Sequence, residues 1–164
     1  KPLRYGLLLA IITILYGFSL GGIFGAFEDN IHDHLKGKAE TVFESVYNSD
    51  INKMNSVLGK SWTYFKRAHL HANGIGTTAL ALILLLSFLE YNRKIKTITA
   101  LALGLGAIGY SSFWMFAALK APLLGSTDAA KEALKWLAVP SAFLCIAGLV
   151  MVLWIVIYGL VIKK

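Results

Sequence analysis

The stretch YGLLLAIITILYGFSLGGIFGAF, residues 5–27, contains no Asp, Glu, Lys, Arg or His. At about 1.5 Å per residue, a helix of this length can cross the roughly 30 Å of hydrocarbon in a bilayer. Three further runs share this property: residues 72–89, 97–119 and 136–162. The sequence therefore predicts an all-α integral membrane protein, a four-transmembrane-helix bundle in which residues 1–164 form a single membrane domain.

The overall composition agrees with this class, because 57% of the residues are hydrophobic and only 15% are charged. Soluble domains carry nearer to about 25% charged residues. A transmembrane β-barrel is excluded, since its strands alternate between polar and apolar residues whereas these runs are continuously apolar. A cleaved signal peptide is the alternative for the first run, which follows Lys1 and Arg4. The run is too long for that alternative, and it lacks an A-x-A-like processing site.

The formal net charge of +7 would suggest nucleic-acid binding in a soluble protein. Here the basic residues gather at one set of predicted helix ends: Lys1, Arg4, Arg93, Lys94, Lys96, Lys163 and Lys164. Short basic segments of this kind mark the cytoplasmic face of membrane proteins. We therefore expect no nucleic-acid partner and both termini in the cytoplasm. The loop of residues 28–71 is expected outside, in the periplasm if the protein is bacterial.

This outer loop is too long for a simple connection and carries apolar residues at helical spacing, so we expect it to be helical. Ser49 and Asp50 form an N-cap signal before its second apolar segment. That segment is expected to run directly into the second span unless Gly59 bends it. Two arrangements stay open: an amphipathic helix lying on the membrane surface, or a folded cap over the bundle.

The connection between the third and fourth spans carries its own helix signals. Pro122 and Gly125 predict a turn, and Ser126 is expected to cap a short helix that follows it. Pro140 lies near the start of the last span, where proline either initiates or kinks a helix.

Glycines recur every four residues in the first span, at Gly17, Gly21 and Gly25. The third span has a comparable strip of small residues around Gly104. Such spacing allows another helix backbone to approach closely within lipid. The partner of these helix-packing glycines is either another span of this chain or another subunit.

All histidines of the chain fall in two H-x-H elements, His32 with His34 and His69 with His71. One element follows the first span and the other precedes the second, so both lie on the outer side at similar depth. On a helix, residues i and i+2 are about 200° apart, so neither element can direct both rings to one point while helical.

We therefore expect one ligand from each element. Glu28, His32 and His69 form the minimal metal site, completed by His34, His71 or Asp33. Imidazole and carboxylate ligands suit copper, iron or zinc, and two opposed histidines suit haem. The alternatives are interfacial histidines that hydrogen-bond to carboxylates and water, or a proton-sensing group.

The stretch RAHLHANG, residues 67–74, resembles the H-x-H helix starts of membrane proteins related to haem-copper oxidases. The chain lacks the further histidines within its spans that those catalytic cores need. Oxygen reduction is therefore not expected.

The leading functional prediction is a small membrane subunit that binds a transition metal or haem at the outer face. It would serve electron transfer or metal handling in a larger complex. The alternative is a non-catalytic scaffold or accessory subunit that binds other membrane subunits through its glycine-lined helices. A permease is disfavoured, because no charged residues line a path through the spans. The expected partners are the lipid bilayer and other membrane subunits, and enzymatic activity stays open.

Overall fold

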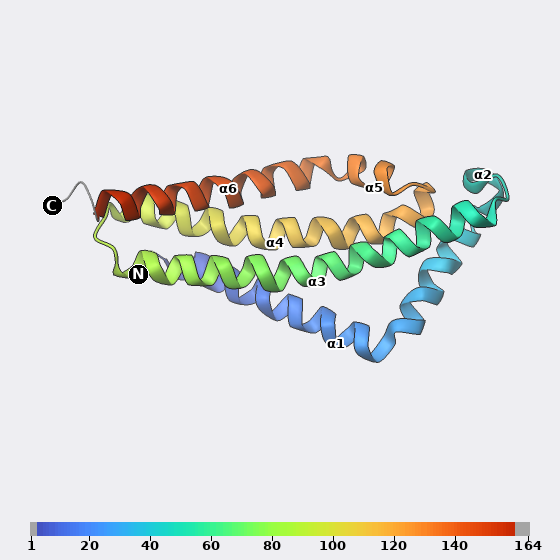
Figure 1. The fold of residues 1–164 in the computed structure, drawn as a ribbon, viewed down its shortest axis with the longest axis horizontal. Coiled ribbons are helices and arrows are strands. Elements are labelled where there is room, and N and C mark those ends of the chain that lie inside the picture. The colour runs from blue at the N-terminus through green and yellow to red at the C-terminus, as the bar shows by residue number, and fades with distance from the viewer. Residues whose placement is uncertain (1–2, 160–164) are drawn as a thin grey trace.

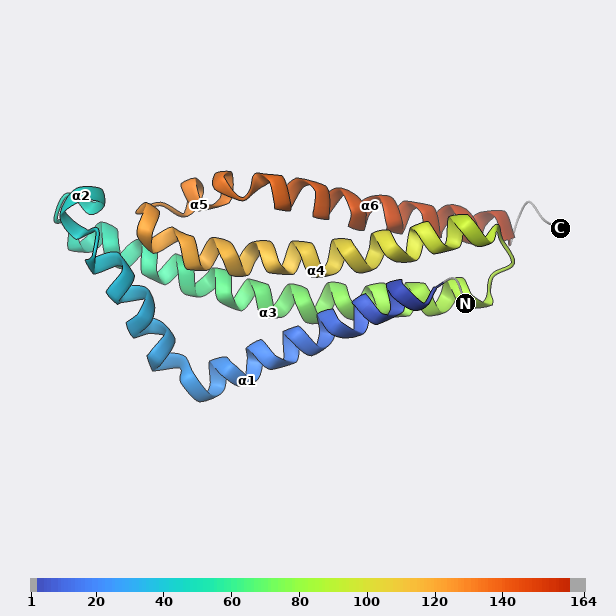
Figure 2. The same ribbon diagram turned by 180° about the vertical axis from the view of Figure 1, so that it is seen from behind.

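The computed structural model describes residues 3–159, which form six helices and no strands (Figures 1 and 2). They are α1 (Arg4–Glu40), α2 (Phe43–Tyr47), α3 (Ile51–Phe88), α4 (Arg93–Leu124), α5 (Thr127–Ala133) and α6 (Lys135–Ile157). Four of them, α1, α3, α4 and α6, are long and apolar enough to cross a membrane. This confirms the predicted all-α class and indicates an integral membrane protein. Lys1, Lys163 and Lys164, used above to predict orientation, lie outside the described residues.

Two of the long helices continue well beyond their predicted spans. The first does not stop at residue 27 but bends at Phe27, whose backbone is non-helical (φ −135°, ψ 28°), and continues to Glu40. Figure 1 shows α1 leaning away from α3 up to this bend and then returning toward it. The segment predicted to lie outside, residues 28–71, therefore consists of the second arm of α1, the short α2 and the first half of α3. We call it the outer segment after that prediction, and the end of the bundle that it covers the outer end.

The predicted N-cap at Asp50 is confirmed, because its carboxylate accepts hydrogen bonds from the backbone N–H groups of Asn52 and Lys53 at 2.9 and 3.0 Å. From there α3 runs into the second span without a bend at Gly59, which confirms the predicted continuous helix. Residues of this outer segment pack on the end of α4. Tyr47 is fully buried, and its hydroxyl donates to the carbonyl oxygen of Pro122 at 2.7 Å.

The connection from α4 to α6 follows the sequence signals with one difference. Ser126 caps α5 by accepting a hydrogen bond from the backbone of Ala129 at 3.2 Å. Gly125 ends α4 with a left-handed backbone (φ 59°), which glycine adopts without steric cost. Pro122 does not lie in the turn, because α4 continues through it to Leu124. Ala121 and Pro122 are buried, and the hydrogen bond from Tyr47 to the Pro122 carbonyl oxygen stabilises the helix at that point.

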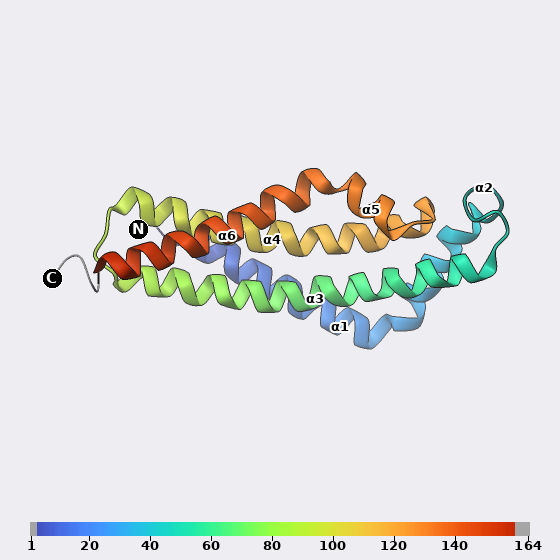
Figure 3. The same ribbon diagram turned by 45° about the horizontal axis from the view of Figure 1, so that its top comes forward.

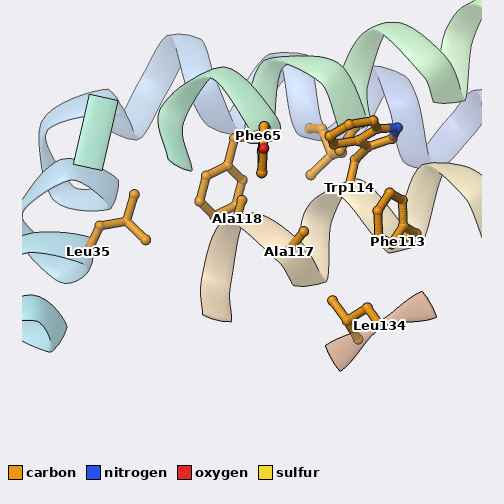
Figure 4. Packing of buried hydrophobic residues seen from close by; sticks show 10 residues of the cluster. Leu35, Phe65, Phe113, Trp114, Ala117, Ala118 and Leu134 are labelled. Carbon is orange, nitrogen blue, oxygen red and sulfur yellow. The ribbon is translucent and has the colours of Figure 1, made fainter. Parts of the chain in front are cut away.

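α4 is the central helix and packs against α1, α3 and α6 (Figure 3). Small residues allow these close approaches. Gly106 lies against the backbone of Cys145 in α6, and Gly104 lies against Leu9 in α1. Toward the α2 end, the core is filled by larger side chains, among them Phe65, Phe113 and Trp114 (Figure 4). Close backbone packing is a main source of cohesion between helices in lipid, where burial of apolar surface contributes little.

Candidate functional site

His69 lies on the face of α3 that packs against α1. Its Nδ1 is 2.8 Å from the carbonyl oxygen of Gly17, and because a carbonyl can only accept, Nδ1 carries the proton and donates. The ring fills the space beside Gly21, where an added Cβ would come within 2.7 Å of the ring carbon Cε1. Gly17 and Gly21 therefore make room for a polar α3 face rather than for another subunit.

Asn73 lies one turn further along the same α3 face and borders Gly17. A Cβ on Gly17 would lie 2.7 Å from the Asn73 Oδ1. The amide nitrogen of Asn73 donates to the backbone oxygen of His69 at 3.2 Å. Its Oδ1 is buried and has no hydrogen-bond partner in the described part of the chain. The contact between α1 and α3 thus holds a polar pair within an otherwise apolar interface.

His32 lies on the outer arm of α1, beside α3. Its Nε2 is 3.8 Å from a carboxylate oxygen of Glu28, and its ring centroid is 4.6 Å from that of Trp62. Phe24 joins this group, with ring centroids 5.4 Å from Trp62 and 6.1 Å from His69. His32 and His69, one from each H-x-H element, are therefore connected by two aromatic side chains: His32 contacts Trp62, Trp62 contacts Phe24, and Phe24 contacts His69.

The other members of the predicted site lie elsewhere. His34 and Asp33 are exposed on the outer arm of α1. His71 points toward α4, where its ring contacts Tyr110 and Trp114 at centroid distances of 5.3 and 5.9 Å. Both H-x-H elements are helical, so their two rings diverge as the helical phase requires. Among residues 3–159, no three His, Cys, Asp or Glu side chains lie close enough to hold a metal ion together.

The predicted packing glycines divide between two roles. Side chains of α3 fill the space beside Gly17 and Gly21. Gly104 packs against α1, at Leu9 and the backbone of Gly6. Gly25 has no atom within 4 Å of an added Cβ, so it takes no part in packing within the described chain. The two glycine strips thus do not pair with each other along their length.

A group of aromatic and cationic side chains between α3 and α4 was not predicted. The guanidinium carbon of Arg67 lies 4.8 Å from the ring centroid of Trp114 and 5.5 Å from that of Tyr64. Tyr64 and Trp114 are in edge contact at 4.9 Å. His71 and Tyr110 complete this group, which we call the Arg67 cluster. The signal was present in the sequence, because Arg67 and His71, like Tyr110 and Trp114, are spaced four apart and share a helix face.

A cavity of about 220 Å³ begins about one turn along α3 from His71. Residues from three helices line it, including Gly74, Ile75 and Thr78 of α3, Leu103 of α4, and Cys145 and Ile146 of α6. Its lining is almost entirely apolar. The Arg67 cluster and this cavity therefore form one continuous face of α3, polar at the outer end and apolar below.

No protein-family model matches the chain, and no curated protein or solved structure is significantly similar to it. The functional argument therefore depends on the geometry of the chain itself.

Proposed function

We propose that the chain is a small integral membrane subunit that assembles with other membrane proteins through the outward face of α1. The supporting observation is that Gly22 and Gly25 have no atom within 4 Å of an added Cβ, whereas Gly17 and Gly21 of the same helix are filled by α3. Small residues allow helix backbones to approach closely in lipid. The outward glycines therefore allow a helix from another chain to approach closely.

Large apolar side chains lie on the same side of α1 as these glycines. Ile11, Leu15 and Phe18 are 47%, 64% and 69% exposed, and their helical phase places them on the same side of α1 as Gly22. A wholly apolar face is equally suited to lipid, so exposure by itself does not distinguish lipid from protein. The two exposed glycines favour a helix, because a neighbouring backbone can approach closely only where side chains are small.

Two leucine substitutions separate assembly from folding. Gly25→Leu should reduce the amount of partner subunits that co-purifies with the tagged chain, while its thermal unfolding stays unchanged. Gly21→Leu should instead disturb the bundle, because the new side chain meets the His69 ring. Gly59→Leu is the matched control, since Gly59 also has open space but lies in the outer half of α3. Retention of every partner by folded Gly25→Leu protein would contradict the proposal.

We also propose that the termini lie in the cytoplasm and that α2 and α5 lie outside. Arg4, Arg93, Lys94 and Lys96 lie around the N-terminal end of α1 and the connection from α3 to α4, in agreement with the positive-inside rule. A Cys145→Ser chain carrying Ser45→Cys should react with a membrane-impermeant thiol reagent added outside intact cells. Reaction only after lysis would reverse the orientation.

A metal or haem subunit is the second candidate, and the hydrogen bond of His69 favours it. Donation from Nδ1 to a backbone carbonyl fixes the tautomer and leaves Nε2 as a metal ligand. His32, with Glu28 beside it, would supply the ligand from α1. Copper, iron, zinc or haem would suit these groups, in electron transfer or metal handling within a larger complex.

Metal analysis and an absorption spectrum of the purified chain test this second candidate. A stoichiometric metal or a haem Soret band, lost in both His69→Ala and His32→Ala proteins, would support it. Folded wild-type protein with neither signal would contradict it and leave the assembly proposal untouched.

A further inference from the structure

A groove runs between α3 and α6, with α4 as its floor. In Figure 3, α6 runs obliquely across α4: its end near α5 lies on the side of α4 away from α3, and its other end lies beside α3. The apolar cavity of about 220 Å³ lies in this groove. Ile146 and Leu149 on its α6 side are 63% and 52% exposed. In a membrane-inserted chain the groove is therefore open to lipid.

Trp114, beside Arg67 at the outer end of the groove, holds a hydrogen-bond donor without an acceptor. Trp114 is 9% exposed, and its buried indole N–H has no partner within the described residues. Figure 4 shows this nitrogen directed along the bundle, away from Phe65 and Ala118. A buried donor without an acceptor costs about 1–3 kcal/mol, so a ligand that supplies an acceptor there binds favourably.

Arg67 provides positive charge at the same place. Its guanidinium lies over the rings of Tyr64 and Trp114, and no carboxylate of residues 3–159 forms an ion pair with it. The nearby cation Lys131, by contrast, is paired with Asp128 at 2.7 Å. An exposed, aromatic-backed guanidinium without an acid partner is well suited to bind a phosphate group.

We propose that this groove binds one phospholipid with an anionic headgroup. Arg67 binds the headgroup phosphate, Trp114 donates its N–H to an oxygen of the headgroup or glycerol ester, and one acyl chain occupies the cavity below Gly74. Arg67 and Gly74 are seven residues apart in α3, which corresponds to a rise of about 10 Å. The polar layer of a bilayer adds roughly 5–8 Å to each side of the hydrocarbon, which is a comparable distance.

The dimensions of the groove favour a lipid over a partner helix. A helix with its side chains is about 10–12 Å across, which is too wide to fit into a cavity of about 220 Å³. A single acyl chain is thin enough to enter it. The charge favours an anionic over a zwitterionic lipid, because a zwitterionic headgroup carries its own cation and gains less from Arg67.

The test counts the lipids retained by the whole chain. The protein is reconstituted in vesicles with equal amounts of phosphatidylglycerol and phosphatidylcholine of the same acyl composition, extracted in mild detergent, and measured by native mass spectrometry. About one phosphatidylglycerol per chain should remain bound to the wild type. Arg67→Gln should reduce this retention at least about tenfold, as expected for loss of charge-assisted hydrogen bonds. The control Lys66→Gln makes the same change in charge on another helix face and should retain the lipid.

A second pair of variants tests the acyl chain. Gly74→Leu fills the cavity from a position with no atom within 4 Å, so the fold should persist while lipid retention is lost. The control Gly59→Leu should behave as wild type. Equal retention of both lipids, or full retention of phosphatidylglycerol by either Arg67→Gln or Gly74→Leu, would overturn the proposal. Cross-linking of Thr78→Cys to another protein inside the groove would also overturn it.

Discussion

Gly106→Ala is the substitution that most directly tests the close packing of α4 and α6. A Cβ at this position would lie 2.7 Å from the backbone nitrogen of Cys145 and 3.0 Å from the carbonyl oxygen of Ser141. Backbone atoms cannot rotate away, so α6 must move outward by about 0.7 Å to restore ordinary contact. Overpacking of this kind costs about 1–3 kcal/mol, and replacing a helical glycine by alanine returns up to about 1 kcal/mol. We therefore expect a net loss of about 1–2 kcal/mol in the free energy of unfolding.

Reversible unfolding in mixed detergent micelles, followed by circular dichroism, measures this loss. Gly22→Ala is the matched control, because it adds the same methyl group to a helix where nothing lies within 4 Å. The control should be neutral or slightly stabilised, since only the helix-propensity gain applies. Gly106→Ala protein as stable as the Gly22→Ala control would refute the packing of α6 on α4.

Three further predictions concern the outer end of the molecule. Asp50→Ala should lower the free energy of unfolding by about 1 kcal/mol in a urea titration, because α3 loses its N-cap; an unchanged midpoint would argue against that cap. Tyr47→Phe should cost about 0.5–1.5 kcal/mol in the same assay through loss of the hydrogen bond to Pro122. Burial raises the pKa of Tyr47, so wild-type stability should fall as the pH rises above the ordinary value of about 10, and less so in the phenylalanine variant. The hydrogen bond and charge of Lys131 lower the pKa of Asp128. The ionised Asp128 therefore stabilises the fold above the ordinary carboxylate pKa, and this stabilisation is lost as the pH falls through the lowered pKa of Asp128. In a pH series of thermal melts, Asp128→Asn protein should lack this loss of stability in acid.

The four spans could be predicted from the sequence because each depends on a local property, an uninterrupted apolar run. The helix ends could not be predicted in the same way, since hydropathy reports where a helix meets lipid and not where its backbone stops. α1 continues through polar residues to Glu40, and α3 begins at Ile51, far outside its apolar run. The start of α3 was nevertheless visible, because the N-cap at Asp50 is a local signal. The bend at Phe27 had no such signal, since no proline precedes or follows it in α1.

The role of each glycine depends on tertiary contacts that spacing alone does not specify. Gly17, Gly21 and Gly25 have one spacing, yet α3 covers the first two and leaves the third open. The bend at Phe27 explains this difference, because α1 has already diverged from α3 near that point (Figure 2). Replacing all three glycines by leucine would therefore mix a folding defect with an assembly defect. The structure separates them, because Gly21→Leu should disturb folding and Gly25→Leu should disturb only assembly.

The second H-x-H element has two separate surroundings because it lies within a continuous helix. His69 meets the backbone of α1 at Gly17, while His71, about 200° further around α3, meets Tyr110 and Trp114 of α4. A substitution at His69 should therefore change the contact between α1 and α3, and one at His71 should change the outer end of the groove that we propose to bind lipid. The spacing that first suggested one shared site thus places its two histidines in different interfaces of the same bundle. A common ligand for both would require α3 to unwind between Ala68 and Ala72, which are both fully buried against neighbouring helices.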